Sequence, residues 1–468
     1  MGDEKYDVAV LGGGPGGYTA GIRASQLGLK ACVIEKDCLG GTCLNRGCIP
    51  TKTFYSNAEH IRKIKHALNF GIKVPSFEID WQLMLKNKND IVNKFTQGVG
   101  FLLKKNGVDH IQGYGTLTAI DKISVEKGGQ TTDILARNII LATGSEPANI
   151  PAFNMDGRNI MNSTDILNMS ELPKSLIIVG GGVVGCEFAS IFAEMGVEII
   201  VIDILPTLLG ITDLDDLIVK MFQSSFKKRG IKIFTSAGVR EIRTTDDGNV
   251  AAYLDNNQVM IAQKALISVG RKLNTDNIGL QEIGIELGTK GEVIVNDKNF
   301  KTNIDNIYAI GDITNKWQLA HVASHQGLLA VESITNNGKS LNSIDYNKVP
   351  SCIFTHPPIA YIGISERKAK ESGYDVAIGK FPYIASGKAV SEGETEGMLK
   401  VVIDKKTKHI LGAHIFGANS TEMIHEFSIA MRNNLTLEEV INSVHAHPTF
   451  SEMIPEACEN AFDLSINI

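Results

Sequence analysis

Two closely spaced cysteines are the residues of this chain best suited to redox chemistry. Cys43 and Cys48 lie in the segment GGTCLNRGCIPTK, residues 40–52. In an ideal helix, residues five apart have Cα atoms roughly 8–9 Å apart, whereas a disulfide requires less than about 7 Å. The two sulfurs can therefore bond only where the segment departs from regular helix, and Gly47 and Pro50 permit that departure.

The cysteine pair has two other interpretations. A structural zinc site would need more Cys or His ligands at short spacing, and none is nearby, so we expect no bound metal. Two inert buried cysteines also fit the spacing alone. The glycine-rich, polar setting favours a redox pair, because a helix N-terminus or a cation there would stabilise a thiolate.

A candidate base lies near the end of the sequence, in HAHPTFSE, residues 445–452. His447 precedes a proline, which restricts its backbone, and Glu452 follows five residues later. A carboxylate that orients an imidazole and raises its basicity is a common base arrangement. The spacing does not show that His447 meets the cysteines, and in a dimer it can come from the other subunit.

Two segments share one pattern: an apolar strand, a G-x-G-x-x-G turn, a helix, and a second strand that ends in an acidic residue. The first has strands at residues 7–11 and 30–34 around a helix at 18–27. The second begins with a strand at residues 175–179. The residues of the pattern are Gly12, Gly14, Gly17 and Glu35 in the first segment and Gly180, Gly182, Gly185 and Asp203 in the second.

In both segments the first glycine and the acid are 23 residues apart (35 − 12 and 203 − 180). The three glycines permit a tight turn, close approach of a pyrophosphate and helix–strand packing, and the acid would bind a ribose. We therefore predict two dinucleotide sites, although glycine-rich turns of parallel sheets are the alternative. Asp203 disfavours a 2′-phosphate, and no Arg or Lys follows closely, which favours NAD over NADP.

Composition excludes several classes of protein. The chain has 468 residues, 43% hydrophobic and 21% charged, which predicts a soluble globular protein of roughly two to four domains. The net charge of −6 disfavours a nucleic-acid partner. No apolar run of about 18 residues predicts a membrane span, and the polar residues 1–6 predict no signal peptide. Seven cysteines, odd in number and sparse, favour a reducing cytoplasm.

The last part of the chain has a different texture. Residues 400–403 and 410–415 alternate as in an antiparallel sheet, and residues 422–433 and 437–444 have helical patterns. The predicted fold class is α/β, with two Rossmann-like dinucleotide-binding domains and an α+β C-terminal dimerisation domain. The predicted boundaries, with the assignments that a family resemblance of these motifs implies, are 1–146 (FAD-binding), 147–274 (NAD-binding), 275–347 (return to the FAD-binding domain) and 348–468 (interface).

These motifs together resemble the pyridine nucleotide–disulfide oxidoreductases over nearly the whole chain. GGTCLNRGCIPTK is similar to the family's disulfide motif, and TNIDNIYAIGDIT, residues 302–314, to its second flavin motif. Residues 140–145 and 266–271 are similar to its domain-joining segments, and HAHPTFSE to its interface motif. His445 and Ala446 favour the branch that oxidises dihydrolipoamide over the glutathione reductases.

The resemblance implies FAD at the first site, NAD at the second, and a homodimer whose active site includes His447 and Glu452 of the partner subunit. The implied substrate is a lipoylated carrier protein of a 2-oxo acid dehydrogenase complex or of the glycine cleavage system. The alternative is an NAD(P)H-dependent reductase of another disulfide, such as glutathione, or of a metal ion. Further cofactor-binding residues implied by the resemblance are Lys52 near the flavin and paired with Glu187, Gly115 on the adenine side, Thr143, Gly144, Ser145, Gly270, Asp312 at the ribityl chain, and Ala320 and His321 beside the flavin.

The sequence departs from the family pattern at three places. Arg46 replaces the usual Val between the cysteines, where a cation either lowers a thiol pKa or points to solvent. Asp203 replaces the commoner Glu. His356 and two prolines stand where an acid usually follows the first proline, and the sequence offers no physical account of that change.

Overall fold

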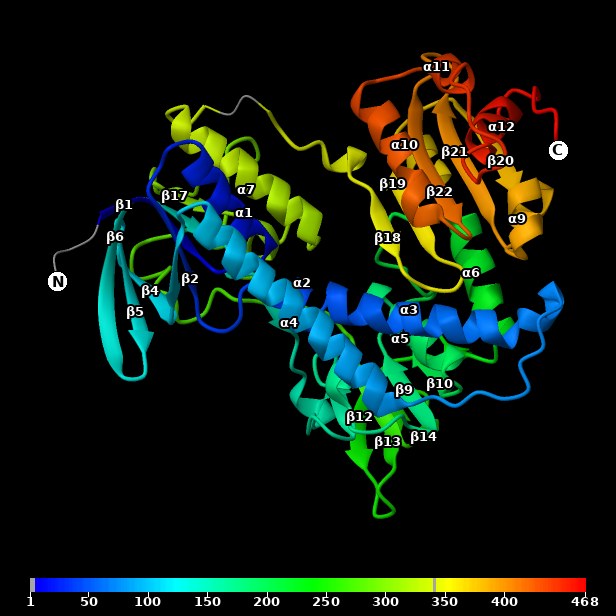
Figure 1. Ribbon diagram of the computed structural model, residues 1–468, viewed down its shortest axis with the longest axis horizontal. Helices are drawn as coiled ribbons and strands as arrows, with labels where there is room; N and C mark the ends of the chain where they lie inside the picture. Colours follow the sequence, from blue (N-terminus) through cyan, green and yellow to red (C-terminus); the bar gives the residue numbers. More distant parts are fainter. Residues whose placement is uncertain (1–4, 340–341) are drawn as a thin grey trace. The chain divides into compact units, whose positions relative to one another are not determined.

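Figure 1 draws the computed structural model of the protein, which describes residues 5–339 and 342–468. Most of the polar start of the chain, for which we predict no signal peptide, lies outside these residues. The chain forms two compact units, each assembled from separate segments. Unit 1 consists of Met1–Phe54, Asp80–Asn149 and Gly270–Ile344, and unit 2 of Tyr55–Ile79, Ile150–Val269 and Asp345–Ile468.

A mixed sheet forms the centre of unit 1. Its strand order is β3-β2-β1-β6-β5-β4, with β17 paired to β6. Strands β3, β2, β1, β6 and β17 are parallel, and β4 and β5 form an antiparallel arm on β6, seen in cyan in Figure 1. Residues 8–11 of β1 are all buried, as expected of a central parallel strand. The strands are β1 (Lys5–Leu11), β2 (Ala31–Glu35), β3 (Asp109–Gln112), β4 (Tyr114–Ala119), β5 (Lys122–Lys127), β6 (Gln130–Leu141) and β17 (Ile307–Ala309).

Helices cover this sheet and carry the cysteines. Helices α1 and α7 lie side by side in Figure 1. Helix α1 begins earlier than the predicted residue 18, because Gly14 caps it and Pro15 fits its first turn. A short strand pair, β7 (Ser145–Pro147) and β16 (Arg271–Leu273), joins two segments of the unit. The helices are α1 (Pro15–Gln26), α2 (Gly41–Arg46), α3 (Cys48–Lys65, which continues into unit 2), α4 (Trp81–Lys105), η4 (Gly311–Thr314) and α7 (Ala320–Thr335).

Unit 2 contains the second predicted nucleotide segment. Its parallel sheet has the order β11-β10-β9-β15-β8, and a smaller antiparallel sheet has the order β12-β13-β14. The elements are β8 (Ile160–Asn162), β9 (Ser175–Val179), α5 (Val183–Glu194), β10 (Glu198–Ile202), α6 (Asp216–Lys228), β11 (Lys232–Phe234), β12 (Val239–Thr244), β13 (Val250–Leu254), β14 (Val259–Ala262) and β15 (Lys264–Ile267), with short 3-10 turns η1 (Ala67–Phe70), η2 (Pro151–Phe153) and η3 (Ile166–Asn168).

The C-terminal part of unit 2 is an antiparallel sheet with the order β18-β19-β22-β21-β20. The two predicted strands are confirmed as β21 and β22, and the second predicted helix ends earlier, at Ile441. The elements are β18 (Ser351–Ile353), β19 (Ile359–Gly363), α8 (Glu366–Glu371), β20 (Val376–Pro382), α9 (Gly387–Glu392), β21 (Met398–Asp404), β22 (Ile410–Phe416), α10 (Ser420–Arg432), α11 (Leu437–Ile441) and α12 (Met453–Asn460), with η5 (Tyr346–Lys348) and η6 (Tyr383–Ala385).

A buried ionic network links the C-terminal sheet of unit 2 to helices α6 and α8. Lys400 Nζ, on β21, donates to both carboxylate oxygens of Asp215 at 2.8 Å and to Glu366 Oε2 at 2.7 Å. Asp215 caps α6, and its backbone N–H donates to His414 Nδ1 at 3.3 Å. Because the Lys400 and Asp215 side chains are only 4% and 3% exposed, each neutralises a charge that would be costly alone.

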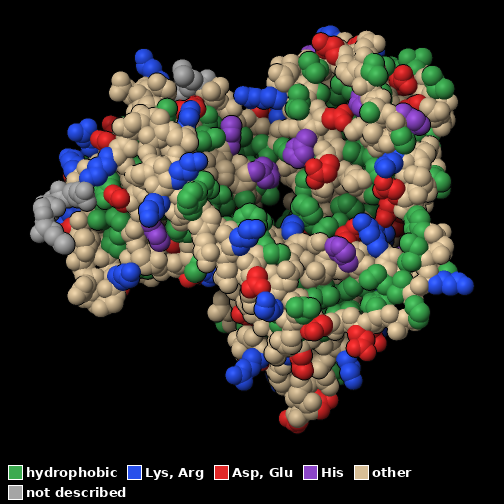
Figure 2. All heavy atoms as spheres, in the orientation of Figure 1, with side chains coloured by type: hydrophobic (Ala, Val, Ile, Leu, Met, Phe, Trp, Pro, Cys, Tyr) green, Lys and Arg blue, Asp and Glu red, His purple; other side chains and the backbone are tan. Residues whose placement is uncertain are grey.

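The distribution of charged side chains agrees with the nearly balanced numbers of acidic and basic residues. On the face drawn in Figure 2, basic and acidic side chains are interspersed, as expected from 46 basic and 52 acidic residues. Among the residues that the structure describes, no helix combines the length and the apolar character that crossing a membrane requires. The predicted fold class is confirmed, since parallel-sheet nucleotide segments and a C-terminal antiparallel sheet with helices are both present.

Candidate redox and nucleotide-binding sites

The two cysteines lie on either side of a break between helices. Helix α2 ends at Arg46, Gly47 has non-helical angles (φ −142°, ψ −110°), and α3 begins at Cys48. This confirms the predicted departure from regular helix. Both cysteines are half-buried thiols in this structure. A hydrogen bond to the Cys48 side chain, burial and the charge of Cys48 raise the pKa of Cys43 far above its usual value, although Lys52 opposes the shift.

Polar side chains fix helix α2 within unit 1. Asn45 Nδ2 donates to the backbone oxygens of Leu39 and Gly41, both at 3.0 Å, and Thr96 Oγ1 on α4 donates to Asn45 Oδ1 at 3.0 Å. The sequence analysis did not select Asn45, because its partner on α4 is 51 residues away along the chain.

Arg46, the unusual residue between the cysteines, has a surface partner. Its guanidinium pairs with the carboxylate of Asp37, and its side chain is 40% exposed. Of the two interpretations, this contact favours a cation at the surface.

A half-buried cation connects the predicted flavin residues. Arg271 donates from Nε to Ser145 Oγ and from Nη2 to the Ser145 backbone oxygen, both at 2.6 Å. Ser145 Oγ in turn donates to Asp312 Oδ2 at 2.5 Å, and Thr42 Oγ1, beside Cys43, donates to the Ser145 backbone oxygen at 3.3 Å. Burial lowers the pKa of Arg271, although the charges of Asp312 and Cys48 oppose the shift. Sequence reasoning quoted Arg271 within a motif but missed it as a site residue.

The glycine turn of unit 1 has the geometry that a nucleotide phosphate requires. Gly12 has φ +110°, and a Cβ on Gly17 would overlap the backbone oxygen of Gly12. A Cβ on Gly14 would meet nothing closer than 3.9 Å, so the backbone there is open to a ligand. The Gly13 N–H donates to Glu35 Oε2 at 2.7 Å, and burial raises the pKa of Glu35 against this hydrogen bond. The turn and the acid therefore meet, as an FAD site needs.

The glycine turn of unit 2 repeats this arrangement. Gly180 has φ +102°, and a Cβ on Gly185 would overlap the backbone oxygen of Gly180. A Cβ on Gly182 would lie 3.6 Å from its nearest neighbour, a side-chain carbon. The N–H of Gly181 donates to Asp203 Oδ2. The residues of the second turn therefore also fit a dinucleotide.

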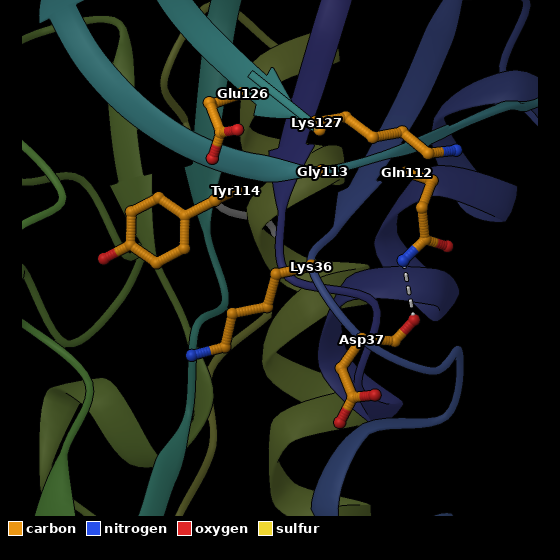
Figure 3. Close-up of a pocket in the computed structure, with 8 residues that line it drawn as sticks. Lys36, Asp37, Gln112, Gly113, Tyr114, Glu126 and Lys127 are labelled. Atoms are coloured by element: carbon orange, nitrogen blue, oxygen red, sulfur yellow. Dashed lines mark hydrogen bonds between the residues drawn. The ribbon is translucent and has the colours of Figure 1, made fainter. Parts of the chain in front are cut away.

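Two neighbouring cavities of unit 1 lie at Glu35 and at the adjacent Lys36. The smaller, of about 240 Å³, is lined by Gly12, Glu35, Gly115 and Thr143 among others. The larger and more open one, of about 550 Å³, is drawn in Figure 3 and shares Lys36, Gly113 and Tyr114 with the first. In that view Lys36 extends toward the Tyr114 ring, with Nζ 5.7 Å from its centre, and Gln112 Nε2 donates to the Asp37 backbone oxygen. The cavities open at the carboxyl ends of β2 and β3, where parallel sheets bind nucleotides.

The remaining predicted cofactor residues occupy several elements. Thr143 Oγ1 donates to the Asn274 backbone oxygen at 2.8 Å, which ties two segments of unit 1 together. Lys52 lies on α3 within unit 1, and Glu187 on α5 of unit 2 accepts a hydrogen bond from the Phe354 N–H at 3.0 Å. Their mutual pairing stays a prediction. The other four are Gly144 and Gly270, with φ of +71° and +123°, and Ala320 and His321, which begin α7.

The predicted base and its carboxylate are in contact in unit 2. His447 Nδ1 lies 2.8 Å from Glu452 Oε1, and the Thr449 N–H donates to Glu452 Oε2 at 2.8 Å. Slight burial raises the pKa of Glu452, but the hydrogen bonds from Thr449 and His447 outweigh this effect. The net shift of the pKa is downward, which favours the charged carboxylate. The His447 side chain is 80% exposed. Glu426, which the sequence analysis missed, holds the neighbouring His445, with Oε2 at 3.0 Å from Nε2.

His356, whose presence the sequence left unexplained, lies in the loop between β18 and β19 and contacts two helices of unit 2, α3 and α5. Its Nδ1 lies 2.7 Å from Glu59 Oε1, its backbone N–H donates to Ser190 Oγ at 2.9 Å, and its ring stacks on Tyr55 at 4.5 Å. Burial raises the pKa of Glu59, but His356 and Arg62 lower it to about 2. His356 is 2% exposed and therefore has a packing role.

Comparison with known proteins gives a consistent assignment. Residues 6–327 match the family model described as pyridine nucleotide-disulphide oxidoreductase, and residues 349–458 match its dimerisation domain. The dihydrolipoyl dehydrogenase of Chlamydia muridarum is 40% identical over 476 residues, covering 100% of this chain and 99% of the relative. That of Bacillus subtilis is 42% identical over 466 residues, covering 97% of each. The HOCl-induced flavoprotein disulfide reductase RclA from Escherichia coli superposes with a TM-score of 0.87 at 27% identity, covering 97% of this chain and 99% of that one.

The chain belongs to the pyridine nucleotide-disulphide oxidoreductase family. It is a flavoprotein oxidoreductase that acts on sulfur groups, with FAD and NAD as cofactors. The full-length curated relatives it resembles are dihydrolipoyl dehydrogenases, and its dimerisation domain supports a homodimer.

Proposed function

We propose that this oxidoreductase is a dihydrolipoyl dehydrogenase that oxidises protein-bound dihydrolipoamide to lipoamide through Cys43 and Cys48 and reduces NAD to NADH. One observation carries the proposal: the two cysteine side chains are in contact across the break between α2 and α3. They lie in the same unit as the first glycine turn, so a redox pair and a nucleotide turn share one scaffold.

The chain's own residues would hold both cofactors. The turn at Gly12, Gly14 and Gly17 with Glu35 would bind FAD, and the Ser145–Arg271–Asp312 network would support its flavin side. The second turn, with Asp203, would bind NAD. When bound, FAD accepts an electron pair from the reduced sulfurs and delivers it to NAD as hydride.

His447 would act as the base. Because Glu452 accepts the hydrogen bond from Nδ1, Nε2 is the nitrogen that takes the proton from a dihydrolipoyl thiol. Its high exposure suits a group that meets a substrate carried on another protein. We propose that each active site receives His447 from the partner subunit.

The thiolate so formed attacks Cys43 Sγ, which breaks the Cys43–Cys48 disulfide and leaves Cys48 as a thiolate. The second dihydrolipoyl thiol then closes the lipoyl ring and releases Cys43, which is protonated. Two electrons have now moved from the substrate's sulfurs to the enzyme's.

The proposed partners are lipoylated carrier proteins of a 2-oxo acid dehydrogenase complex or of the glycine cleavage system, and the proposed compartment is the cytoplasm. The sparse cysteines favour a reducing compartment. The rival substrate is a disulfide such as glutathione, which we favour less because the relatives named above are dihydrolipoyl dehydrogenases.

Cys43→Ser and Cys48→Ser test the proposal. Each variant should lose lipoamide turnover yet retain FAD, because the glycine turn is untouched. The matched control is Cys38→Ser, which changes an exposed cysteine of the same segment and should keep full activity. Wild-type activity in either variant would refute the mechanism, and faster turnover with glutathione disulfide than with lipoamide would favour the rival substrate.

A further inference from the structure

Helix α2, which carries Cys43, is too short to be stable alone. It spans Gly41–Arg46, six residues, and isolated helices shorter than about 12–15 residues are marginal in water. The backbone angles of Gly47, which follows α2, are not helical. The helical hydrogen-bond pattern is therefore interrupted between α2 and α3. The position of Cys43 relative to Cys48 therefore depends on contacts that other residues supply.

Asn45 supplies three such contacts from a single side chain. Its amide nitrogen donates to the backbone oxygens of Leu39, before the helix, and Gly41, its first residue. Its amide oxygen accepts from Thr96 Oγ1 on α4, a 25-residue helix of the same unit. The Asn45 side chain therefore connects α2 both to Leu39, in the loop between β2 and α2, and to the long helix α4.

These contacts matter most when the disulfide is open. While Cys43 and Cys48 are bonded, the covalent link itself holds α2 against α3. Once the bond is reduced, relaxation toward one continuous helix would carry the Cα atoms to roughly 8–9 Å apart, beyond the reach of a disulfide. A residue that holds α2 in place keeps the effective concentration of the two thiols high.

We propose that Asn45 is a positioning residue that keeps the reduced sulfurs at bonding distance and thereby lowers the reduction potential of the Cys43–Cys48 couple. This inference rests on the proposed redox role of the two cysteines. Asn45 acts through the backbone of α2 and through Thr96.

The test measures a thiol–disulfide equilibrium. The FAD-loaded protein is incubated anaerobically in buffers of reduced and oxidised dithiothreitol, then quenched in acid and alkylated. Mass spectrometry of the peptide that contains Cys43 and Cys48 then gives the ratio of its dithiol and disulfide forms. Each dithiothreitol molecule that closes its ring disulfide gives up two protons and two electrons, and Cys43 and Cys48 each gain one proton and one electron as their bond breaks.

Asn45→Asp keeps the size of the side chain but replaces the donor with a carboxylate, which only accepts hydrogen bonds. The equilibrium should move about tenfold toward the dithiol, as expected from the loss of one or two net hydrogen bonds. Thr96→Val removes one contact and leaves Asn45 intact, so it should move the equilibrium about threefold. The matched control is Asn106→Asp, which removes a comparable bond to the Leu102 backbone oxygen at the far end of α4 and should leave the equilibrium unchanged.

Three outcomes separate the possibilities. An equilibrium for Asn45→Asp within twofold of wild type overturns the role of Asn45 while the proposed function stands. If Asn45→Asp does not fold, Thr96→Val decides, and an unchanged equilibrium there overturns the role. Failure of the wild-type protein to form the Cys43–Cys48 disulfide at any buffer ratio overturns the proposed function together with this inference.

Discussion

At the scale of single residues, one side-chain contact is suited to electron transfer and another to proton transfer. Cys43 meets Cys48 in unit 1 and can carry electrons, while His447 meets Glu452 in unit 2 and can carry a proton. The first contact is half-buried and the second is exposed. The exposure of the second contact suits its proposed role, since a base must reach a macromolecular substrate.

His447→Gln should reduce turnover with dihydrolipoamide about 10²- to 10⁴-fold, the usual contribution of a positioned acid–base group. Gln cannot take a proton from the substrate thiol, while binding of both cofactors should be unaffected. Steady-state rates with NAD and dihydrolipoamide measure the loss, and reduction of ferricyanide by NADH, which bypasses the substrate thiol, should persist. His425→Gln, which changes an exposed histidine on α10, is the control. A decrease below threefold would exclude His447 as the base.

The residues proposed for the chemistry could be selected from the sequence, whereas the contacts that surround them could not. Cys43, Cys48, His447 and Glu452 follow from residue type and short spacing. The supporting contacts do not, because Arg271 meets Ser145 across 126 positions of the chain. Such long-range pairs depend on how strands and helices assemble, which no local pattern contains.

At the scale of secondary-structure elements, corresponding residues have the same structural roles in the two glycine turns. In each, the first glycine adopts a positive φ, the third leaves room for a backbone oxygen, and an acid closes the turn. Both were predictable, because the turn residues and the 23-residue offset are local features of the sequence. The lengths of α1 and α11 were less so, since caps and tertiary packing decide where a helix ends.

Two alanine substitutions in the second turn should separate folding from NAD binding. Gly185→Ala places a Cβ on the Gly180 backbone oxygen, so it should destabilise the protein by about 1–3 kcal/mol, the usual cost of overpacking. Gly182→Ala adds a Cβ in ordinary van der Waals contact with Ile211, 3.6 Å away, and should leave stability intact, but it should raise the KM for NAD by blocking the approach of the pyrophosphate. Thermal melts and KM values measure the two effects. Equal melting temperatures for both variants would contradict this account of the turn.

The buried His414 on β22 makes the linkage between the C-terminal sheet and the start of helix α6 sensitive to acid. Its Nδ1 accepts from the Asp215 N–H, and its Nε2 lies 3.2 Å from the Ile364 backbone oxygen, so the ring is neutral. Burial and the charge of Lys400 lower its pKa from 6.5 to about 4, although Asp215 opposes the shift. Between these values the unfolded chain binds a proton that the native protein does not, so stability falls as pH falls from 6.5 to 4, by up to about 3 kcal/mol.

His414→Gln should remove this part of the acid sensitivity, because an amide can still accept from Asp215 and donate to Ile364. The urea midpoint should decrease less between pH 7 and pH 4.5 in this variant than in the wild type. His425→Gln, with an exposed side chain, should behave as the wild type. A parallel decrease in all three proteins would show that His414 has no such effect.

At the scale of the whole molecule, one chain supplies a sulfur pair, two nucleotide turns and a base from two units assembled from interleaved segments. A single chain in this account does not make a complete active site, since we propose that the base comes from the partner subunit. On this proposal, the dimerisation domain at residues 349–458 would contribute to catalysis as well as to assembly. We propose that the sulfur pair accepts two electrons from the substrate and passes them to the flavin.

The most direct test is an anaerobic titration of the FAD-loaded protein with dithionite, followed by absorption spectroscopy. The account predicts uptake of four electrons per subunit, two by the Cys43–Cys48 disulfide and two by FAD, with a long-wavelength thiolate–flavin band after the first two. Cys48→Ser should take up only two electrons, without that band. Uptake of two electrons by the wild-type protein, with no such band, would contradict the account.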